Sequence, residues 1–77
     1  MPEEIVFRSP EEILRHAIER EADSYDYYFS AAMQTNDLRL RRFLLDLAET
    51  EKEHQDRLKA KLETLESERF VESAITC

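Results

Sequence analysis

The chain contains no glycine, and its two prolines, Pro2 and Pro10, both lie within the first ten residues. Hairpin turns, β-bulges and phosphate-binding loops therefore lack the residue that adopts positive φ most easily. From Glu11 onward no residue interrupts a helix, and Ala, Leu, Glu, Arg and Lys, which favour helices, dominate. The sequence predicts an all-α protein.

The first helix has a clear predicted start. Ser9 can cap the helix, Pro10 suits its first position, and Glu12 lies where the acidic member of a capping box belongs. The helical pattern then continues to about Met33.

The chain has one mid-chain group of turn-forming residues, Thr35-Asn36-Asp37. Asp37 is suited to cap a second helix, which we expect to end at about Glu66 because the apolar stripe is lost beyond it. The predicted organisation is an N-terminal arm over residues 1–9, a helical hairpin over residues 10–66 and a tail, frayed helix or disordered, over residues 67–77.

Both predicted helices carry a stripe with alternating spacings of three and four residues, as in helices that pack on other helices. The stripe of the first helix is Leu14, Ile18, Glu21, Tyr25, Tyr28 and Ala32, and that of the second is Leu40, Leu44, Leu47, Glu51, His54 and Leu58. If the chain folds back at Asn36, these positions pair one to one, Leu14 with Leu58 through to Ala32 with Leu40. Stripe and turn therefore predict the same antiparallel two-helix hairpin.

A chain of 77 residues rarely buries enough apolar surface to be stable without disulfides, a metal or a partner. Disulfides within the chain are excluded because Cys77 is the only cysteine. The apolar stripe of a lone hairpin has no cover, and a second copy would complete a four-helix bundle. We therefore expect a homodimer or a larger homo-oligomer such as a ring.

Charge and hydropathy narrow the function further. The net charge of −7 disfavours nucleic-acid binding and suits the attraction of cations. No run of about 20 apolar residues is present, so no membrane partner is expected. The opening residues MPEEIVFRSP lack the features of an export signal, and the single cysteine fits a reducing compartment. These features favour a cytoplasmic location.

Three ionisable residues, Glu21, Glu51 and His54, occupy stripe positions where leucine would be expected. Glu21 and Glu51 each lie 15 residues from Asn36, about 22 Å along their helices, so they should be level with each other. Two carboxylates at one height in an apolar seam repel each other unless a cation lies between them. His54 follows Glu51 by one helical turn and could bind the same cation.

A two-fold axis would double this set to four glutamates and two histidines. That is the ligand inventory of dinuclear carboxylate sites in helical bundles. Oxygen and imidazole ligands without thiolate favour iron or manganese, with zinc as an alternative. The rival interpretations are a structural or regulatory dimeric hairpin with a polar seam, and a metal-binding domain without turnover.

The other polar and aromatic residues near this set have weaker interpretations. Tyr25 and Tyr28 flank this set on the side of the turn. They are expected either to pack in the core or to form a second layer that hydrogen-bonds the ligands or carries redox chemistry. His16, Glu19 and Asp23 are expected on the surface.

Three segments resemble the rubrerythrin branch of the ferritin-like superfamily, and among its members the encapsulated ferritins, or half-ferritins, most of all. They are Ala17-Ile18-Glu19-Arg20-Glu21, Tyr27-Tyr28-Phe29 and Leu47-Ala48-Glu49-Thr50-Glu51-Lys52-Glu53-His54. The resemblance covers about residues 12–66.

The resemblance implies a di-iron ferroxidase that oxidises Fe(II) with O₂ for iron storage or detoxification. Glu21 would be the ligand from the first helix, Glu51 the bridging carboxylate and His54 the terminal ligand, in a site shared between subunits. It further implies an encapsulin shell as partner, and a location inside that nanocompartment.

Overall fold

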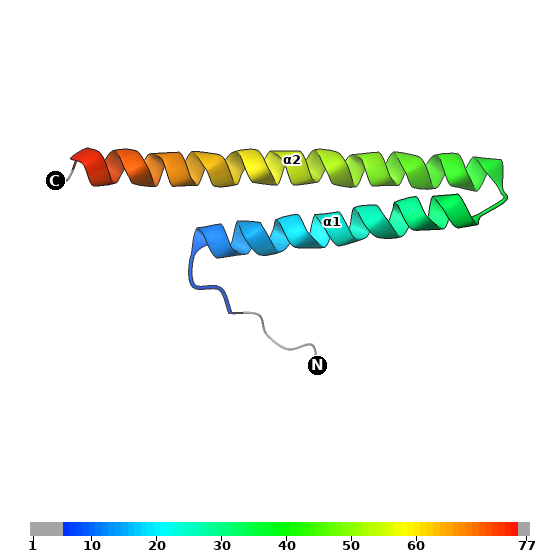
Figure 1. The fold of residues 1–77 in the computed structure, drawn as a ribbon, viewed down its shortest axis with the longest axis horizontal. Coiled ribbons are helices and arrows are strands. Elements are labelled where there is room, and N and C mark those ends of the chain that lie inside the picture. Colours follow the sequence, from blue (N-terminus) through cyan, green and yellow to red (C-terminus); the bar gives the residue numbers. More distant parts are fainter. Residues whose placement is uncertain (1–5, 76–77) are drawn as a thin grey trace.

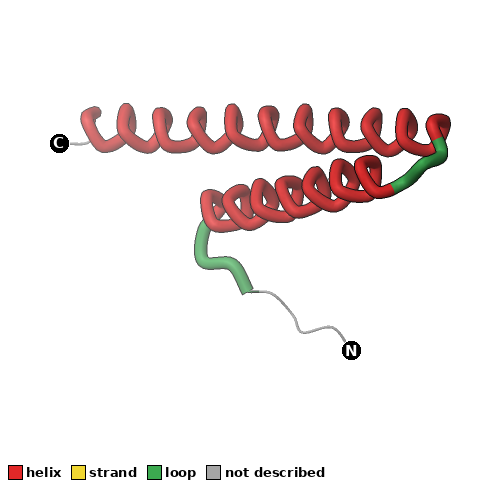
Figure 2. Tube along the Cα trace, turned by 45° about the vertical axis from the view of Figure 1, so that its right-hand side comes forward, coloured by secondary structure: helices red, strands yellow, loops and turns green. Residues whose placement is uncertain are grey.

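The structure is a computed structural model that describes the backbone of residues 6–75 and the side chains of residues 6–69. Two helices, α1 (Pro10–Gln34) and α2 (Leu38–Ile75), lie side by side and antiparallel (Figures 1 and 2). The predicted all-α hairpin is confirmed. The Cα atoms span 61 × 31 × 11 Å, so the hairpin is a single layer of helices with both faces open.

Local hydrogen bonds define the start of α1. The Ser9 hydroxyl accepts from the amide of Glu12 at 3.1 Å, as predicted for an N-cap. The Glu12 carboxylate accepts from the amide of Arg8 at 3.1 Å. The carboxylate thus reaches one residue beyond the cap, instead of closing the reciprocal box on the amide of Ser9.

The turn between the helices is short and closed by side chains. Asp37 caps α2 as predicted, because its Oδ1 accepts from the amides of Arg39 and Leu40 at 3.0 and 3.1 Å. Arg41 performs a role that the sequence analysis did not foresee. Its guanidinium donates to the carbonyls of Ala32 and Thr35 at 3.0 and 2.7 Å, which satisfies acceptors at the end of α1.

The contact between the helices buries little. Among the described side chains, the only fully buried apolar residues are Ala32 and Ala48. Most predicted stripe residues are half-buried. Leu40, predicted to pair with Ala32 in the seam, is 44% exposed, and Arg41 donates to the carbonyl of Ala32. One chain therefore holds its helices together without a core of large side chains.

The end of α2 differs from the sequence prediction. We expected the helix to end at about Glu66, and it continues to Ile75. The Arg69 side chain, which interrupts the apolar stripe, lies 2.6 Å from the carboxylate of Glu11, which is 8% exposed. Arg15 and Glu66 form a second, exposed pair at 3.2 Å. Glu66 and Arg69 thus have partners on α1, while residues 76 and 77 lie outside the described part.

The described part of the N-terminal arm folds against α1. The rings of Phe7 and His16 meet edge to face with centroids 5.5 Å apart. His16 is therefore half-buried under the arm, where a surface position was predicted. Residues 1–5 of the predicted arm lie outside the described residues. Neither α1 nor α2, within the residues described, has a stretch apolar enough to cross a bilayer.

The pair of Arg69 and Glu11 predicts an asymmetric response to mutation. Arg69→Ala leaves a buried carboxylate without its cation and should lower the free energy of unfolding by about 1–3 kcal/mol. Glu11→Ala leaves only an exposed arginine and should cost less. Chemical denaturation followed by circular dichroism measures both. Equal costs, or a larger cost for Glu11→Ala, would contradict the assigned burial of Glu11.

Candidate metal centre

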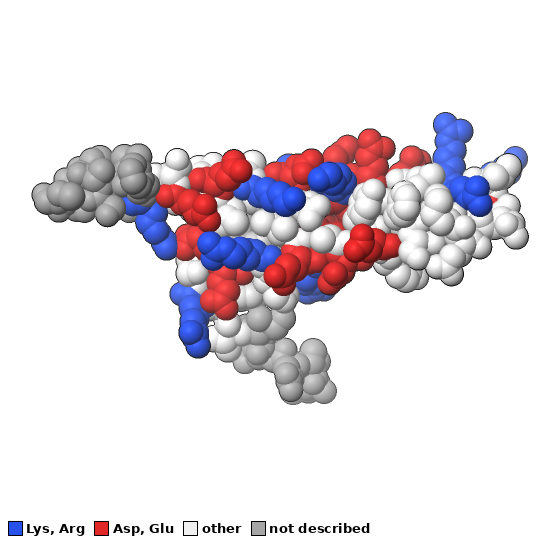
Figure 3. All heavy atoms as spheres, in the orientation of Figure 1, with Lys and Arg blue, Asp and Glu red and all other residues white. Residues whose placement is uncertain are grey.

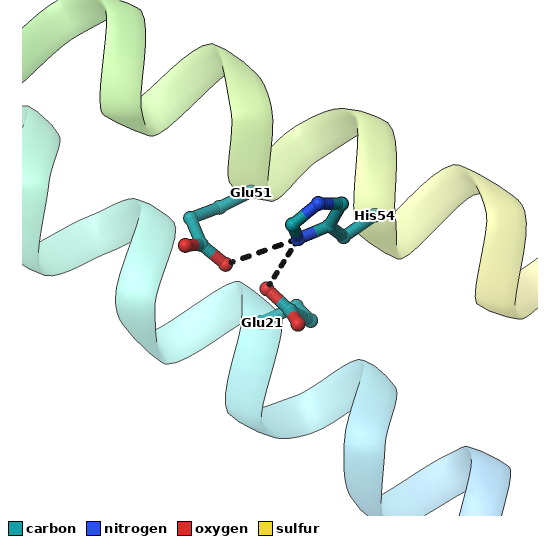
Figure 4. Close-up of side chains that lie close together, drawn as sticks. All are labelled: Glu21, Glu51 and His54. Atoms are coloured by element: carbon teal, nitrogen blue, oxygen red, sulfur yellow. Dashed lines mark ion pairs between the residues drawn. The ribbon is translucent and has the colours of Figure 1, made fainter.

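The structure brings Glu21, Glu51 and His54 together, as the sequence analysis predicted. Glu21 projects from α1, while Glu51 and His54 project from successive turns of α2 toward it (Figure 4). His54 Nδ1 lies 3.6 Å from Glu21 Oε2 and 3.9 Å from Glu51 Oε2. One ligand atom from each of the three residues lies within 4.8 Å of the others. Glu21 and Glu51 thus lie opposite each other across the hairpin, as predicted.

One carboxylate oxygen of this cluster lacks a hydrogen-bond partner. Glu21 Oε2 is buried and has no hydrogen-bond partner among the described residues. The Nδ1 atom of His54 lies 3.6 Å from this oxygen, a distance too long for a hydrogen bond. A buried carboxylate oxygen without a donor is costly. A cation between the three side chains would remove that cost.

The size of the cluster fits a metal ion. Ligand bonds of about 2.0–2.2 Å place atoms on opposite sides of an ion about 4.4 Å apart. A small rotation of the three side chains would therefore bring their ligand atoms within bonding distance of one ion. The donor set, two carboxylates and one imidazole, suits iron, manganese or zinc. Iron and manganese take about six ligand atoms, and three residues supply only part of that number. The cluster of one chain would therefore leave part of such a coordination sphere to other ligands.

The cluster is partly exposed to solvent. The side chains of Glu21 and Glu51 are 26% and 20% exposed, and that of His54 is 44% exposed. No lysine or arginine forms an ion pair with Glu21 or Glu51 in the described part of the chain. Glu49, Lys52 and Glu53 are exposed on the outer face, as predicted from helical phase.

Two arginines near the cluster escaped the sequence analysis. Arg57 lines an open hollow of about 390 Å³ together with Glu21, His54 and Leu58. Arg20 lines a second hollow, of about 370 Å³, with Glu21 and Glu51. Their positions in the sequence could have indicated that they lie near the cluster, because Arg57 follows His54 by three residues and Arg20 directly precedes Glu21.

The two tyrosines flanking the cluster take part in aromatic contacts. Tyr25 stacks on Phe29 with ring centroids 5.9 Å apart, and Tyr28 meets Tyr27 edge to face at 5.5 Å. Within residues 6–69 neither phenol hydrogen-bonds to Glu21, Glu51 or His54. These contacts accord with packing, and the proposed role in a second layer stays a prediction.

The described part of the chain is thus a thin helical hairpin with a partly exposed Glu/Glu/His cluster. No family model matches the sequence, and neither a curated protein nor a solved structure is significantly similar to it. The three side chains and their surroundings are therefore the structural basis for a functional interpretation.

Proposed function

We propose that the chain is a ferroxidase-type di-iron carboxylate protein that oxidises Fe(II) with O₂ at a site shared between two copies. The observation that carries the proposal is the convergence of Glu21, Glu51 and His54 around a buried carboxylate oxygen without a donor. The resemblance of the sequence to encapsulated ferritins supports iron over manganese or zinc. Iron storage or detoxification in the cytoplasm is the purpose that fits this activity.

A second copy would complete both the fold and the site. The single layer has no large buried apolar side chain in its described part, and the ligand set is partly exposed. Two hairpins related by a two-fold axis make a ferritin-like four-helix bundle with four glutamates and two histidines around two ions. A ring of such dimers would preserve the same site.

In this proposal Fe(II) is the substrate. Two ferrous ions each give up one electron, and O₂ takes both electrons with two protons to leave as hydrogen peroxide. Carboxylate ligands stabilise Fe(III) more than Fe(II) because they are anionic, so Glu21 and Glu51 favour the oxidised state. His54 holds its side of the ion through Nδ1, the nitrogen that faces both carboxylates. A single layer of helices cannot enclose a mineral, so ferric iron would pass to another compartment such as an encapsulin shell.

An anaerobic titration with Fe(II) tests this proposal. We expect saturation at about one ion per chain, or two per paired site. Glu21→Ala, Glu51→Ala and His54→Ala should each weaken binding strongly. Binding that is unchanged in all three variants would contradict the assignment. Metal binding without faster oxidation in air would instead identify a metal-binding domain without turnover.

The assembly leads to a further prediction. Sedimentation at micromolar concentration should find little folded monomer, because the apolar stripe of one chain has no cover. Fe(II) or Mn(II) should shift the population toward the assembled form, since binding to a shared site stabilises that form by mass action. A stable helical species of 9.2 kDa that ignores metal would contradict the shared site.

A further inference from the structure

The hollow beside the metal cluster carries hydrogen-bond donors that the proposed ferroxidase chemistry does not use. It is lined by Glu21, His54, Arg57 and Leu58, with a volume of about 390 Å³. Arg57 has no carboxylate within ion-pair distance and no hydrogen bond among the described residues. A guanidinium offers five donors in a fork that matches oxyanions.

His54 supplies a second donor. Its Nδ1 faces Glu21 and Glu51, and its other ring nitrogen, Nε2, points away from both carboxylates (Figure 4). A metal ion on Nδ1 fixes the proton of the neutral ring on Nε2. Metal-bound histidines usually donate that N–H to an acceptor. No residue between 6 and 69 accepts a hydrogen bond from Nε2 in this structure.

The charge balance of the hollow changes when metal binds. Without metal, Glu21 and Glu51 give the cluster a negative charge that repels anions. A divalent ion neutralises both carboxylates, and Arg57 then makes the net charge of the half-site positive. Oxidation to Fe(III) adds one further positive charge. Metal binding therefore turns this hollow from a site that rejects anions into one that attracts them.

We infer that the metal-loaded protein binds a small oxyanion beside the ions, held by the guanidinium of Arg57 and the Nε2–H of His54. This inference rests on the proposed metal site. The anion lies outside the coordination sphere, because Nε2 points away from the metal side of the ring. It offsets the charge gained on oxidation and places phosphate-like anions where ferric iron forms.

Titration calorimetry with inorganic phosphate tests the inference on protein loaded with Mn(II), which does not react with O₂ as Fe(II) does. The parent should bind phosphate with Mn(II) present and lose most of that affinity in chelator. Arg57→Gln should weaken phosphate binding about tenfold or more, as expected for a lost charge-assisted hydrogen bond, while its Mn(II) affinity remains. Bound Mn(II) should also broaden the phosphorus resonance of phosphate in the parent and not in Arg57→Gln.

Arg20→Gln is the matched control, because Arg20 lines the other hollow beside Glu21 and loses the same charge. It should leave phosphate binding within about twofold of the parent. Equal losses in the two variants, or no phosphate binding by Mn(II)-loaded parent, would overturn the inference and leave the metal site intact. If Arg57→Gln instead lowers the mass in solution, Arg57 pairs with a second copy and the inference is also wrong. Failure of both Mn(II) and Fe(II) to bind the parent would overturn the proposed function itself.

Discussion

Replacing either Glu51 or His54 with alanine is expected to abolish most of the protein's acceleration of iron oxidation. Anaerobic protein given about two ferrous ions per dimer and then air should develop ferric absorbance faster than iron in buffer. In a symmetric shared site one substitution removes a ligand from both halves at once. The rate in Glu51→Ala and His54→Ala should therefore fall close to that of buffer, measured by stopped-flow absorbance.

The adjacent acidic residues supply the control for this experiment. Glu49 and Glu53 lie on the same helix, carry the same charge as Glu51, and are exposed. Glu49→Ala and Glu53→Ala should retain most of the parental rate. If they slow oxidation as much as Glu51→Ala, the effect comes from the general negative potential of the helix, and the three-residue site is wrong.

A second large effect is expected on the stability of the metal-free protein when Glu51 is replaced by leucine. Glu51→Leu should raise the stability of the metal-free protein by about 1–4 kcal/mol, as when buried charges give way to packed apolar residues. Glu51 is 20% exposed in one chain and lies close to the like charge of Glu21, so leucine removes repulsion and adds apolar burial. The parent should gain stability when Fe(II) or Mn(II) is added, and Glu51→Leu should lose that gain.

Thermal melts of both proteins, with metal and with chelator, measure these changes. Glu49→Leu serves as the control, since its exposed position should give little change in the metal-free melt and leave the response to metal intact. A structural or register role for Glu51 predicts a different outcome. Glu51→Leu would then scramble the oligomeric state, and metal would leave the melting temperature of the parent unchanged.

The hairpin was predictable because three local signals agree. The absence of glycine excludes most alternatives, Ser9 and Asp37 cap the helices through hydrogen bonds that are local in sequence, and the stripes match across the turn. The end of α2 was not predictable in this way. Arg69 breaks the apolar stripe, and only the folded hairpin shows that its partner is Glu11, 58 residues earlier.

The metal cluster was predictable for a related reason. Glu21, Glu51 and His54 stand out against an apolar stripe, and the helical repeat with the position of the turn fixes their relative height. Arg20 and Arg57 were missed because an arginine off the stripe resembles any solvent-exposed charge in the sequence. Their relation to the cluster appears only in the folded hairpin, where each lines a hollow together with residues of both helices.

We propose that Glu21, Glu51 and His54 bind a metal ion shared between two copies. Anomalous diffraction from crystals of protein loaded with Fe or Mn tests it most directly. We expect a pair of anomalous peaks related by a two-fold axis, with oxygens of Glu21 and Glu51 and Nδ1 of His54 within coordination distance. Crystals soaked in metal that show these side chains in mutual contact, with no anomalous peak between them, would contradict the claim.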